Sequence, residues 1–328
     1  MGARAAGSGP QQNTPQVSVV IPTRDRWDVL LRRALRAALS QRRVPVEVIV
    51  VDDCSNQPPP AAPRLSDPRV TVIKQNAHRG VAAARNLGID AARTGWVAFL
   101  DDDDVWAPSK LNTIIESIMR SGAEFGYSSA LAVDDDLLPL WEIDAPPTDQ
   151  LLDWLLRCNV MPAGASNVVA KRSILERCGG FDEDFSVVAD WDMWLRLAEH
   201  GSPAQTNEVL IAYSIGNWVL RDDAVHRAEF SRLVEKHASV ADSRGVPADW
   251  VAHERWIARN LYLAGRRAEA ARLYLASGFR YRDPGSLARA AGALVGPEVR
   301  ARLRVGQKAT PSQAPEWLRP YADGVPAG

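Results

Sequence analysis

The chain has 328 residues, which is enough to bury the core of one large domain or of two smaller ones. Its net charge of −1, with 46% hydrophobic and 24% charged residues, is ordinary for a globular protein and argues against nucleic acid as a partner. The three cysteines lack metal-ligand spacing, so we expect reduced thiols and no disulfide scaffold.

The first 15 residues are rich in Gly, Ala, Gln and Pro and are expected to be disordered. They contain no apolar run of the kind found in secretion signals. No later segment approaches the roughly 20 apolar residues that a membrane-spanning helix needs. We therefore expect a cytoplasmic protein without a membrane span, which at most binds a membrane peripherally.

Apolar strands alternate with amphipathic helices along the first hundred residues. Four apolar runs predict strands, at 17–22, 46–53, 69–74 and 96–100, the last of them buried. Apolar residues at helical spacing predict helices over 28–41 and within 75–94. This alternation predicts an α/β fold in which helices flank a mostly parallel sheet wound by right-handed crossovers.

Polar residues follow three of these strands directly, at 22–25, 52–53 and 101–104. Because the carboxyl ends of parallel strands line one crevice, where ligands bind, we expect the three loops to form a single site. Arg79 and Arg85, near the start of and within the next helix, are candidates for contact with an anionic ligand there. Their alternative role is that of solvated helix charges.

Four consecutive carboxylates, Asp101–Asp104, follow a buried strand. Carboxylates so crowded repel one another and lose hydration, so each tends to take up a proton unless a cation neutralises the site. Mg²⁺ and Mn²⁺ are held by one or two carboxylates together with phosphate oxygens. The run therefore predicts a metal site built on Asp101 with Asp103, or on Asp102 with Asp104; a solvated acidic turn is the alternative.

Further elements follow the acidic run. The pattern predicts a helix over 109–122, a strand or strand pair over 124–136, a helix over 151–161 and another within 186–201. Turn chemistry accounts for Asp134–Asp136 as a hairpin turn rather than a second metal site. Asp190 lies in the first turn of the last helix, where an Asp on its own most simply caps free backbone N–H groups. Asp192 is the neighbouring candidate.

Residues 222–328 are expected to form successive amphipathic helices. These helices either pack against the preceding domain or join two copies of the chain into a homodimer. His226 is a candidate metal or phosphate ligand, although a histidine on a helix surface is more common. The Pro- and Ala-rich tail from residue 307 is expected to be poorly ordered or to lie over the surface.

Five segments together resemble the family 2 glycosyltransferases, whose catalytic domain has the GT-A fold. In chain order they are VSVVIPTRDR, VEVIVVDDCS, NAHRGVAAARNLGI, WVAFLDDDDVWAPSKL and GGFDEDFSVVADWDMWLRL. The similarity covers about residues 16–215. It implies a GT-A catalytic domain over 16–221, in which 16–108 bind a nucleotide sugar and 109–221 face the acceptor, followed by the helical region 222–328.

The resemblance implies a metal-dependent, inverting transfer of a sugar from a nucleotide diphosphate sugar, by preference a UDP-sugar, to an acceptor hydroxyl. Asp53 would pair with the base edge, Asp103 would ligate Mn²⁺ or Mg²⁺, and Asp190 would be the general base. The other residues implied in donor binding are Pro22, Thr23, Arg24, Arg79, Asp101 and Asp102.

The chain departs from the family pattern at two points. Ala189-Asp190 stands where the family commonly has Glu-Asp, so an acidic neighbour of the base is missing. The Gln-x-x-Arg-Trp motif of processive relatives is also absent, which favours one sugar per encounter. The acceptor could be a saccharide, a lipid-linked intermediate or a small natural product. Competing interpretations are an inactive scaffold, a nucleotidyltransferase that makes sugar nucleotides and, least favoured, a phosphotransferase with an Asp nucleophile.

Overall fold

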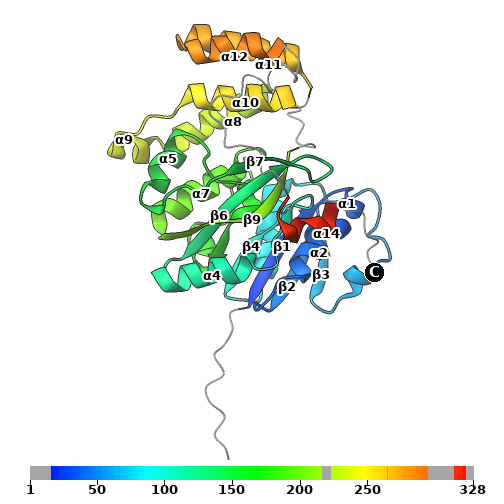
Figure 1. The fold of residues 1–328 in the computed structure, drawn as a ribbon. Coiled ribbons are helices and arrows are strands. Elements are labelled where there is room, and N and C mark those ends of the chain that lie inside the picture. The colour runs from blue at the N-terminus through cyan, green and yellow to red at the C-terminus, as the bar shows by residue number, and fades with distance from the viewer. Residues whose placement is uncertain (1–15, 216–222, 264, 295–313, 323–328) are drawn as a thin grey trace, which may run out of the picture.

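The computed structural model describes residues 16–215, 223–263, 265–294 and 314–322 (Figure 1). Within these ranges nine strands form one sheet in the order β3-β2-β1-β4-β8-β6-β9-β5, with β7 paired to β6. Helices cover both faces of this sheet, and a further group of helices stands at one end of the molecule (Figure 1). The predicted α/β fold with C-terminal helices is confirmed.

The N-terminal half of the sheet is parallel, as predicted. Its strands are β1 (Val17–Thr23), β2 (Val46–Asp52), β3 (Val70–Lys74) and β4 (Trp96–Phe99). β1 pairs with β2 on one side and β4 on the other, and β2 pairs with β3. Every residue of β1 is buried, which explains why its sequence is a nearly continuous β-branched run.

The other half of the sheet is mixed. Its strands are β5 (Val105–Trp106), β6 (Phe125–Val133), β7 (Pro139–Ile143), β8 (Val169–Lys171) and β9 (Pro203–Ser214). β8 runs antiparallel to both β4 and β6, whereas β6 and β9 are parallel. β6 and β7 form the hairpin that the sequence predicts at 134–136, and the Asp134 carboxylate accepts hydrogen bonds from the backbone N–H groups of Asp136 and Leu138.

Two hydrophobic cores lie on opposite faces of the sheet. The first is covered by α1 (Trp27–Arg32), α2 (Ala34–Leu39) and α4 (Lys110–Ser121). The second is covered by α3 (Val81–Ala91), α5 (Leu151–Arg157), α6 (Arg172–Arg177) and α7 (Ala189–His200). Helix α3 packs so closely on β1 that a Cβ at Gly88 would lie 2.2 Å from a methyl carbon of Val20.

The helix predicted over 28–41 is broken into α1 and α2. Arg33, between them, has φ −112° and ψ −88°, outside the helical region. The break lets the Arg33 guanidinium turn inward, where it donates to the carbonyl of Asp103 at 3.2 Å and to the hydroxyl of Ser214 at 2.8 Å. One side chain thereby joins α1–α2 to the acidic loop and to the end of β9.

Four short 3₁₀ helices also belong to the described structure: η1 (Pro63–Ser66), η2 (Thr148–Gln150), η3 (Gly164–Asn167) and η4 (Glu316–Leu318). η4 leads into α14 (Arg319–Ala322), so the chain returns to the first face of the sheet near its C-terminus (Figure 1). Leu318 is fully buried in the first core. Arg36 of α2 donates to the carbonyl of Pro320 at 2.8 Å and lies over the ring of Tyr321. Residues 314–322 of the C-terminal tail therefore lie against the sheet domain, which agrees with the expectation that the tail lies over the surface.

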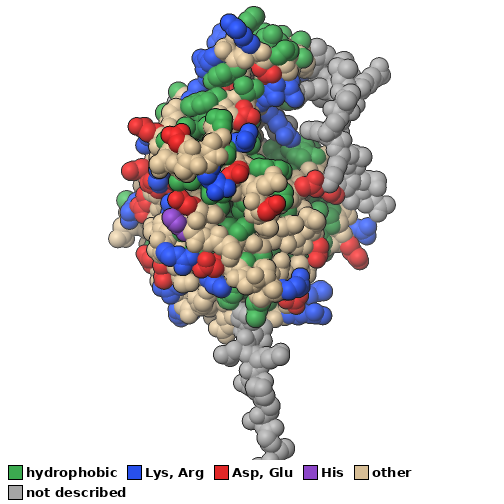
Figure 2. Space-filling model, turned by 90° about the vertical axis from the view of Figure 1, so that its left-hand side faces the viewer, with side chains coloured by type: hydrophobic (Ala, Val, Ile, Leu, Met, Phe, Trp, Pro, Cys, Tyr) green, Lys and Arg blue, Asp and Glu red, His purple; other side chains and the backbone are tan. Residues whose placement is uncertain are grey.

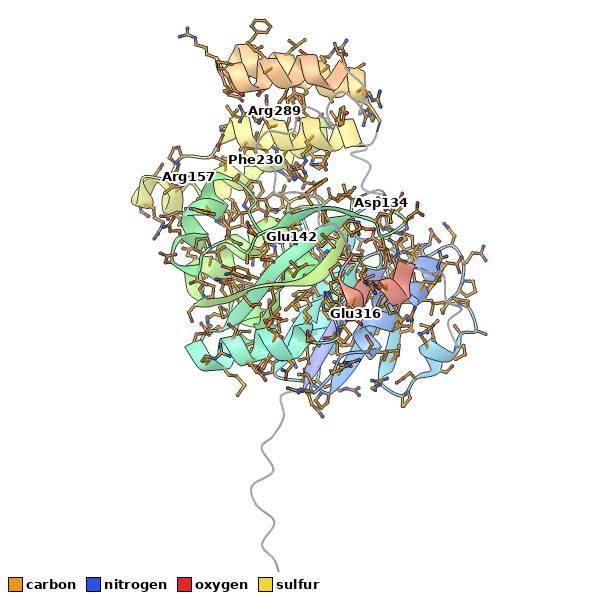
Figure 3. All side chains as sticks on the ribbon, viewed as in Figure 1. Asp134, Glu142, Arg157, Phe230, Arg289 and Glu316 are labelled. Atoms are coloured by element: carbon orange, nitrogen blue, oxygen red, sulfur yellow. The ribbon has the colours of Figure 1, made fainter. Side chains whose placement is uncertain are left out.

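The C-terminal helices are α8 (Asp223–Lys236), α9 (Ala238–Arg244), α10 (Trp250–Leu263), α11 (Arg267–Arg280) and α12 (Pro284–Leu294). α8 and α9 pack on the second core, and Phe230 of α8 lies at this junction (Figure 3). Helices α10–α12 share a small core of their own. Arg259 of α10 stacks over the ring of Trp141 in β7, 4.1 Å from its centroid. The helices thus pack against the preceding domain, one of the two roles expected.

The visible surface carries side chains of both charges, spread over the sheet domain and the C-terminal helices (Figure 2). No helix in the described parts of the chain is both long and apolar enough to cross a bilayer. All three cysteines are unpaired. His226 is buried against Trp256 rather than exposed on its helix.

Candidate active site

The loops that follow β1, β2 and β4 meet at one edge of the sheet, as the sequence predicts. The Thr23 hydroxyl donates to the Asp102 carboxylate at 2.8 Å, which joins the first loop to the fourth strand's loop. The backbone N–H of Asp25 donates to the Ser55 hydroxyl at 2.8 Å, which joins the first loop to the second. Pro22 is buried at the end of β1, and Arg24 is exposed in the loop that follows.

Two arginines neutralise part of the acidic run. Arg85 of α3 donates to Asp101 at 2.6 Å, and its guanidinium lies over the ring of Phe181. Arg26 donates to Asp103 at 2.7 Å and approaches Asp102 at 3.3 Å. Arg85 is buried, so the alternative of a solvated helix charge is wrong for this residue. Arg26 was not among the sequence candidates, although it stands in the loop after β1.

In the described ranges, the run has four carboxylates but only two arginine partners, so its buried members take up protons more readily than an ordinary Asp. Burial raises the pKa of Asp102 to about 7, and the neighbouring Asp103 adds to the shift, although Arg26 opposes it. Asp104 is fully buried, and burial with repulsion from Asp103 raises its pKa well above the ordinary value. One Asp104 oxygen accepts from the Ser214 N–H at 2.9 Å, and the other has no hydrogen-bond partner within the described structure.

The donor set fits a hard divalent cation that draws part of its coordination from elsewhere. In the parts of the chain that the structure describes, no three His, Cys, Asp or Glu side chains form a metal-ligand cluster. Mg²⁺-type sites commonly use only one or two carboxylates and take the remaining ligands from phosphate and water. Asp103 is the less enclosed of the two carboxylates that Arg26 contacts, and a cation bound there would have to displace that guanidinium.

Asp53 is held by four donors. Its carboxylate accepts from the backbone N–H groups of Arg79 at 2.8 Å and Gly80 at 3.0 Å, and so fixes the start of α3. It also accepts from Gln75 at 3.1 Å and pairs with the His78 ring at 2.6 Å. A carboxylate offers about four lone-pair positions, so all of them are used. The His78 side chain is 52% exposed, which makes it the partner that a ligand N–H can most easily replace.

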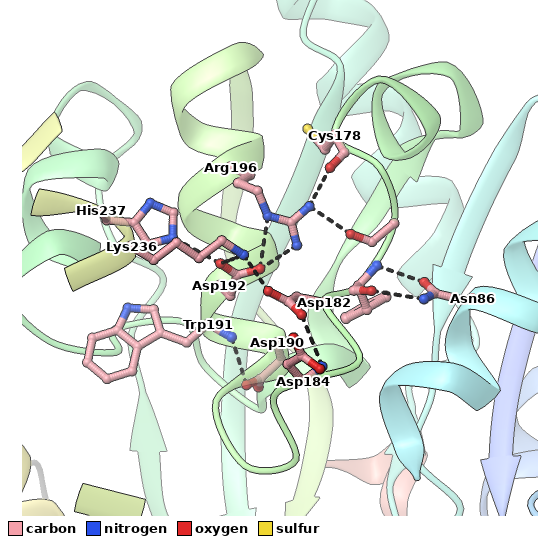
Figure 4. Close-up of polar contacts among 12 residues, drawn as sticks. Asn86, Cys178, Asp182, Asp184, Asp190, Trp191, Asp192, Arg196, Lys236 and His237 are labelled. Atoms are coloured by element: carbon pink, nitrogen blue, oxygen red, sulfur yellow. Dashed lines mark hydrogen bonds and ion pairs between the residues drawn. The ribbon is translucent and has the colours of Figure 1, made fainter. Parts of the chain in front are cut away.

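Asp190 stands in the first turn of α7. One of its oxygens accepts from the Trp191 N–H at 2.8 Å, so the capping contact that the sequence suggests is present (Figure 4). The other oxygen lies over Gly164 of η3. In the same 3₁₀ helix the Ser166 hydroxyl accepts from the Asp101 N–H at 2.9 Å. η3 thus connects Asp190 to the acidic run.

Desolvation raises the pKa of Asp190 above its ordinary value, and the Arg85 guanidinium opposes that shift. Asp101 raises it further, which places Asp190 within electrostatic reach of the acidic run. A carboxylate with a raised pKa is a stronger base than an exposed one. The environment of Asp190 therefore suits proton removal.

Tyr213 of β9 lies among these carboxylates and was not among the sequence candidates. Burial raises the pKa of its hydroxyl, and the surrounding negative charges raise it further. Those charges belong to Asp104, Asp103, Asp190 and Asp101. Asp103 and Asp190 are 87 residues apart in sequence, yet both act on this one hydroxyl. The two acids predicted from sequence therefore lie within electrostatic reach of one side chain.

The loop before α7 is tied to α3. Asn86 accepts from the Phe181 N–H at 2.7 Å and donates to the Phe181 carbonyl at 2.9 Å (Figure 4). Arg79, predicted to contact an anionic ligand, forms a 2.6 Å ion pair with Glu183 of the same loop. Both side chains of this pair are exposed, so an anionic ligand can compete with Glu183 for Arg79.

Asp192 forms a second junction beside Asp190. It is fully buried and contacts Arg196 at 2.5 Å, Lys236 at 2.7 Å and His237 at 3.0 Å (Figure 4). Burial alone would raise the pKa of Asp192, but these donors outweigh it and lower the pKa to about 2. Arg196 also donates to the carbonyls of Cys178 and Gly180. Asp192 is therefore an ionised structural centre that joins α7, its preceding loop and α8.

Gly164→Ala is expected to distort the site. Gly164 has φ +48°, where a side chain costs about 1–2 kcal/mol, and an added Cβ would lie 2.6 Å from the free Asp190 oxygen. We expect a lower melting temperature, measured by thermal unfolding, and a large loss of the activity that depends on Asp190. Gly95→Ala is the matched control, because its Cβ would meet nothing within 4 Å. Full turnover in Gly164→Ala would show that the Asp190 carboxylate does not need this position.

Comparison with known protein families identifies the chain. The family model described as "Glycosyl transferase family 2" matches residues 18–179. The chain belongs to glycosyltransferase family 2. The match covers β1 to the Gly-Gly turn after α6, and it ends before α7 and the C-terminal helices.

Two relatives of this glycosyltransferase are curated bacterial proteins. The succinoglycan biosynthesis protein ExoO of Rhizobium meliloti (strain 1021) is 41% identical over 123 residues, which cover 37% of this chain and 35% of ExoO. The UDP-Glc:alpha-D-GlcNAc-diphosphoundecaprenol beta-1,3-glucosyltransferase WfaP of Escherichia coli is 26% identical over 235 residues, which cover 71% of this chain and 88% of WfaP. The chain thus spans about a third of one relative and most of the other.

Solved structures of TarS from S. aureus share the fold. One has a TM-score of 0.51 at 15% identity and covers 76% of this chain and 43% of TarS. A TarS 1–349 structure in complex with UDP-GlcNAc has a TM-score of 0.51 at 14% identity, covering 81% of this chain and 73% of that one. At such low identity the likeness shows the fold alone, and it confirms the GT-A prediction.

Proposed function

We propose that this glycosyltransferase moves a sugar from a UDP-sugar to a hydroxyl group of a growing saccharide, in a single inverting displacement that adds one sugar per encounter. The observation that carries the proposal is the pairing of two unlike acidic centres. The run 101–104 crowds four carboxylates against two arginines, and burial with this crowding raises the pKa of Asp102 and Asp104, whereas Asp190, connected to the run through η3, is a desolvated single carboxylate. One centre suits a metal-bound diphosphate and the other suits a general base.

The names of the similar proteins support a UDP-sugar as donor. WfaP is named for transfer from UDP-Glc, and one TarS structure contains UDP-GlcNAc. The WfaP acceptor is a saccharide on diphosphoundecaprenol. For this chain we accordingly propose a saccharide acceptor that is carried on a lipid, which would bring the enzyme to the membrane surface as a peripheral protein.

Several residues at the ends of strands β1 to β4 and in the loops after them are proposed to bind the sugar-nucleotide donor. Asp53 would accept the base N–H in place of His78, which is the exposed member of its four partners. Asp102 would remain fixed by Thr23 and face the ribose, while Asp101 stays paired with Arg85. The remaining contacts proposed are with Pro22, Arg24 and Arg79.

Asp103 is proposed to hold Mn²⁺ or Mg²⁺ together with the donor diphosphate, after Arg26 has left its carboxylate. Such an ion supplies Lewis-acid stabilisation of the charge that develops on the leaving diphosphate. Arg26 and Arg85 remain nearby as positive side chains that also favour an anionic leaving group. Asp104 keeps the loop in place through its hydrogen bond from Ser214.

Asp190 is proposed to remove the proton from the acceptor hydroxyl as its oxygen attacks the anomeric carbon. The oxygen that faces Gly164 carries no hydrogen bond from the Trp191 N–H, which binds the other oxygen. The missing acidic neighbour at Ala189 leaves Asp190 as the base without a second carboxylate beside it in sequence. General-base assistance of this kind is worth about 10²–10⁴-fold in rate.

A nucleotide panel tests the proposal directly. UDP, GDP, dTDP and CDP are added with and without Mn²⁺, and the melting temperature is measured, because a ligand that binds only the folded state raises stability by mass action. We expect the largest rise with UDP and Mn²⁺ together, and slow release of UDP from UDP-glucose or UDP-GlcNAc. No shift with any nucleotide would contradict the proposal. Binding without any hydrolysis or transfer would favour an inactive scaffold.

A further inference from the structure

A carboxylate of the C-terminal helices binds the loop that leads into α7. Glu229 of α8 accepts from three consecutive backbone N–H groups, those of Ser186 at 2.9 Å, Val187 at 2.8 Å and Val188 at 3.1 Å. It also accepts from the Ser186 hydroxyl at 2.6 Å. Successive N–H groups that converge in this way form an anion-binding concavity.

These hydrogen bonds compensate the free-energy cost of burying the Glu229 carboxylate. The Glu229 side chain is only 5% exposed, and a buried carboxylate is strongly unfavourable unless it is hydrogen-bonded. Burial raises the pKa of Glu229, but the four hydrogen bonds outweigh it and hold the pKa below the ordinary value. An ionised glutamate of α8 therefore binds the backbone directly before α7, the helix that carries Asp190. The first helical turn has no side-chain cap from its own N-cap residue, Val188.

The same helix also holds the residue that follows Asp190. Phe230, next to Glu229, stacks on the Trp191 ring with centroids 5.3 Å apart. About two turns further along, Lys236 at the end of α8 and His237 directly after it contact Asp192 (Figure 4). Side chains of α8 and of the residue that follows it therefore fix the chain on both sides of Asp190. This arrangement lies outside the segment that the family model matches.

We propose that Glu229 is a positioning residue for Asp190, and that α8 belongs to the catalytic unit rather than to an appended domain. The inference rests on the proposed function, in which Asp190 is the general base. Glu229 holds residues 186–188, and the backbone of Asp190 continues directly from them. Misplacing a reacting group by about 1 Å through a distant change can cost about 10²-fold in rate, so small movements of this loop matter.

Glu229→Gln tests the inference, with release of UDP from UDP-GlcNAc in the presence of Mn²⁺ as the assay. The amide keeps the size of the side chain but replaces an accepting oxygen by an NH₂ group that faces backbone donors. We expect kcat per UDP-binding site to fall about 10- to 10²-fold, while KM for UDP-GlcNAc stays unchanged. Glu254→Gln is the matched control, since Glu254 is also a buried glutamate of the C-terminal helices but pairs with Arg227 and Arg280.

A double variant separates positioning from a loss of stability. If Glu229 acts through Asp190, then adding Glu229→Gln to Asp190→Asn should not lower the residual rate further. An equal fall in both backgrounds would overturn the inference. If Glu229→Gln fails to fold, Ser186→Ala replaces it as the test variant. This change removes one hydrogen bond from the Glu229 carboxylate at an exposed position and should lower kcat to a smaller extent. An unchanged kcat in Ser186→Ala would overturn the inference.

The outcomes also distinguish this inference from the proposed function. A normal rate in Asp190→Asn would overturn both, because no base would then remain to be positioned. A slow Asp190→Asn together with a normal kcat in Glu229→Gln would overturn only the role of Glu229. A fall in kcat for Glu254→Gln as large as that for Glu229→Gln would also overturn it, because the effect would then belong to the helical region as a whole.

Discussion

Asp190→Asn should lower kcat by about 10²–10⁴-fold, because the amide cannot accept the proton of the acceptor hydroxyl. Affinity for UDP should stay at the wild-type level, since the proposed contacts with the nucleotide and its diphosphate belong to Asp53, Asp102 and Asp103 rather than to Asp190. The measurements are UDP release from UDP-GlcNAc or UDP-glucose and calorimetric titration with UDP. Asp184→Asn is the control, because Asp184 is an exposed acid of the preceding loop.

The pH dependence adds a second test of Asp190. Only the ionised carboxylate is a base, so kcat should rise as the pH rises through the pKa of Asp190. Burial places that pKa above the ordinary value for Asp, so the rise should occur at a higher pH than for an exposed acid. The rise should vanish in Asp190→Asn. A variant that turns over at the wild-type rate would remove Asp190 from the mechanism.

Asp103→Ala should abolish the dependence of donor binding on Mn²⁺. The loss of metal-borne charge stabilisation is expected to lower the rate by about 10²–10³-fold. Titration with UDP in Mn²⁺ and then in EDTA checks this directly: the wild type should bind more weakly in EDTA, whereas the variant should bind equally in both.

The hairpin between β6 and β7 offers the control for this experiment. Asp136 is an exposed acid in a second acidic run, and Asp136→Ala should leave Mn²⁺-dependent binding intact. A variant of Asp103 that still binds UDP more tightly with Mn²⁺ would place the ion elsewhere. Loss of the effect in Asp136→Ala instead would revive the second acidic run as a metal site.

The parallel half of the sheet could be predicted from sequence because three of its four strands, β1, β2 and β4, are largely buried on both faces. β1, β2 and β4 are continuous apolar runs that end in polar loops, and their order alone implies the crevice. β9 could not be predicted in this way. Its register against β6 shifts between Ser128 and Ser129, so that Asn207 and Glu208 are exposed and interrupt the apolar pattern. Tyr213 was missed with the strand that carries it.

The acids of the site could be predicted, whereas their partners could not. A run of carboxylates after a strand is visible in sequence, and its chemistry follows from crowding alone. The identity of the neutralising side chains depends on how distant loops fold together. Arg26 and Arg33 look like ordinary helix-flanking charges in sequence, yet the break at Arg33 directs one of them to the acidic loop. Glu229 carries no sequence pattern that connects it to a loop 41 to 43 residues earlier.

The anchoring of residues 314–322 on α1 and α2 changes how the chain should be divided. Because Leu318 fills the core beside the first helices, the sheet domain includes segments from both ends of the described chain. Helices α8–α12 then lie, in sequence, between two parts of one domain. A truncated chain that stops before α8 would therefore lose not only Glu229 but also the segment that completes the first core.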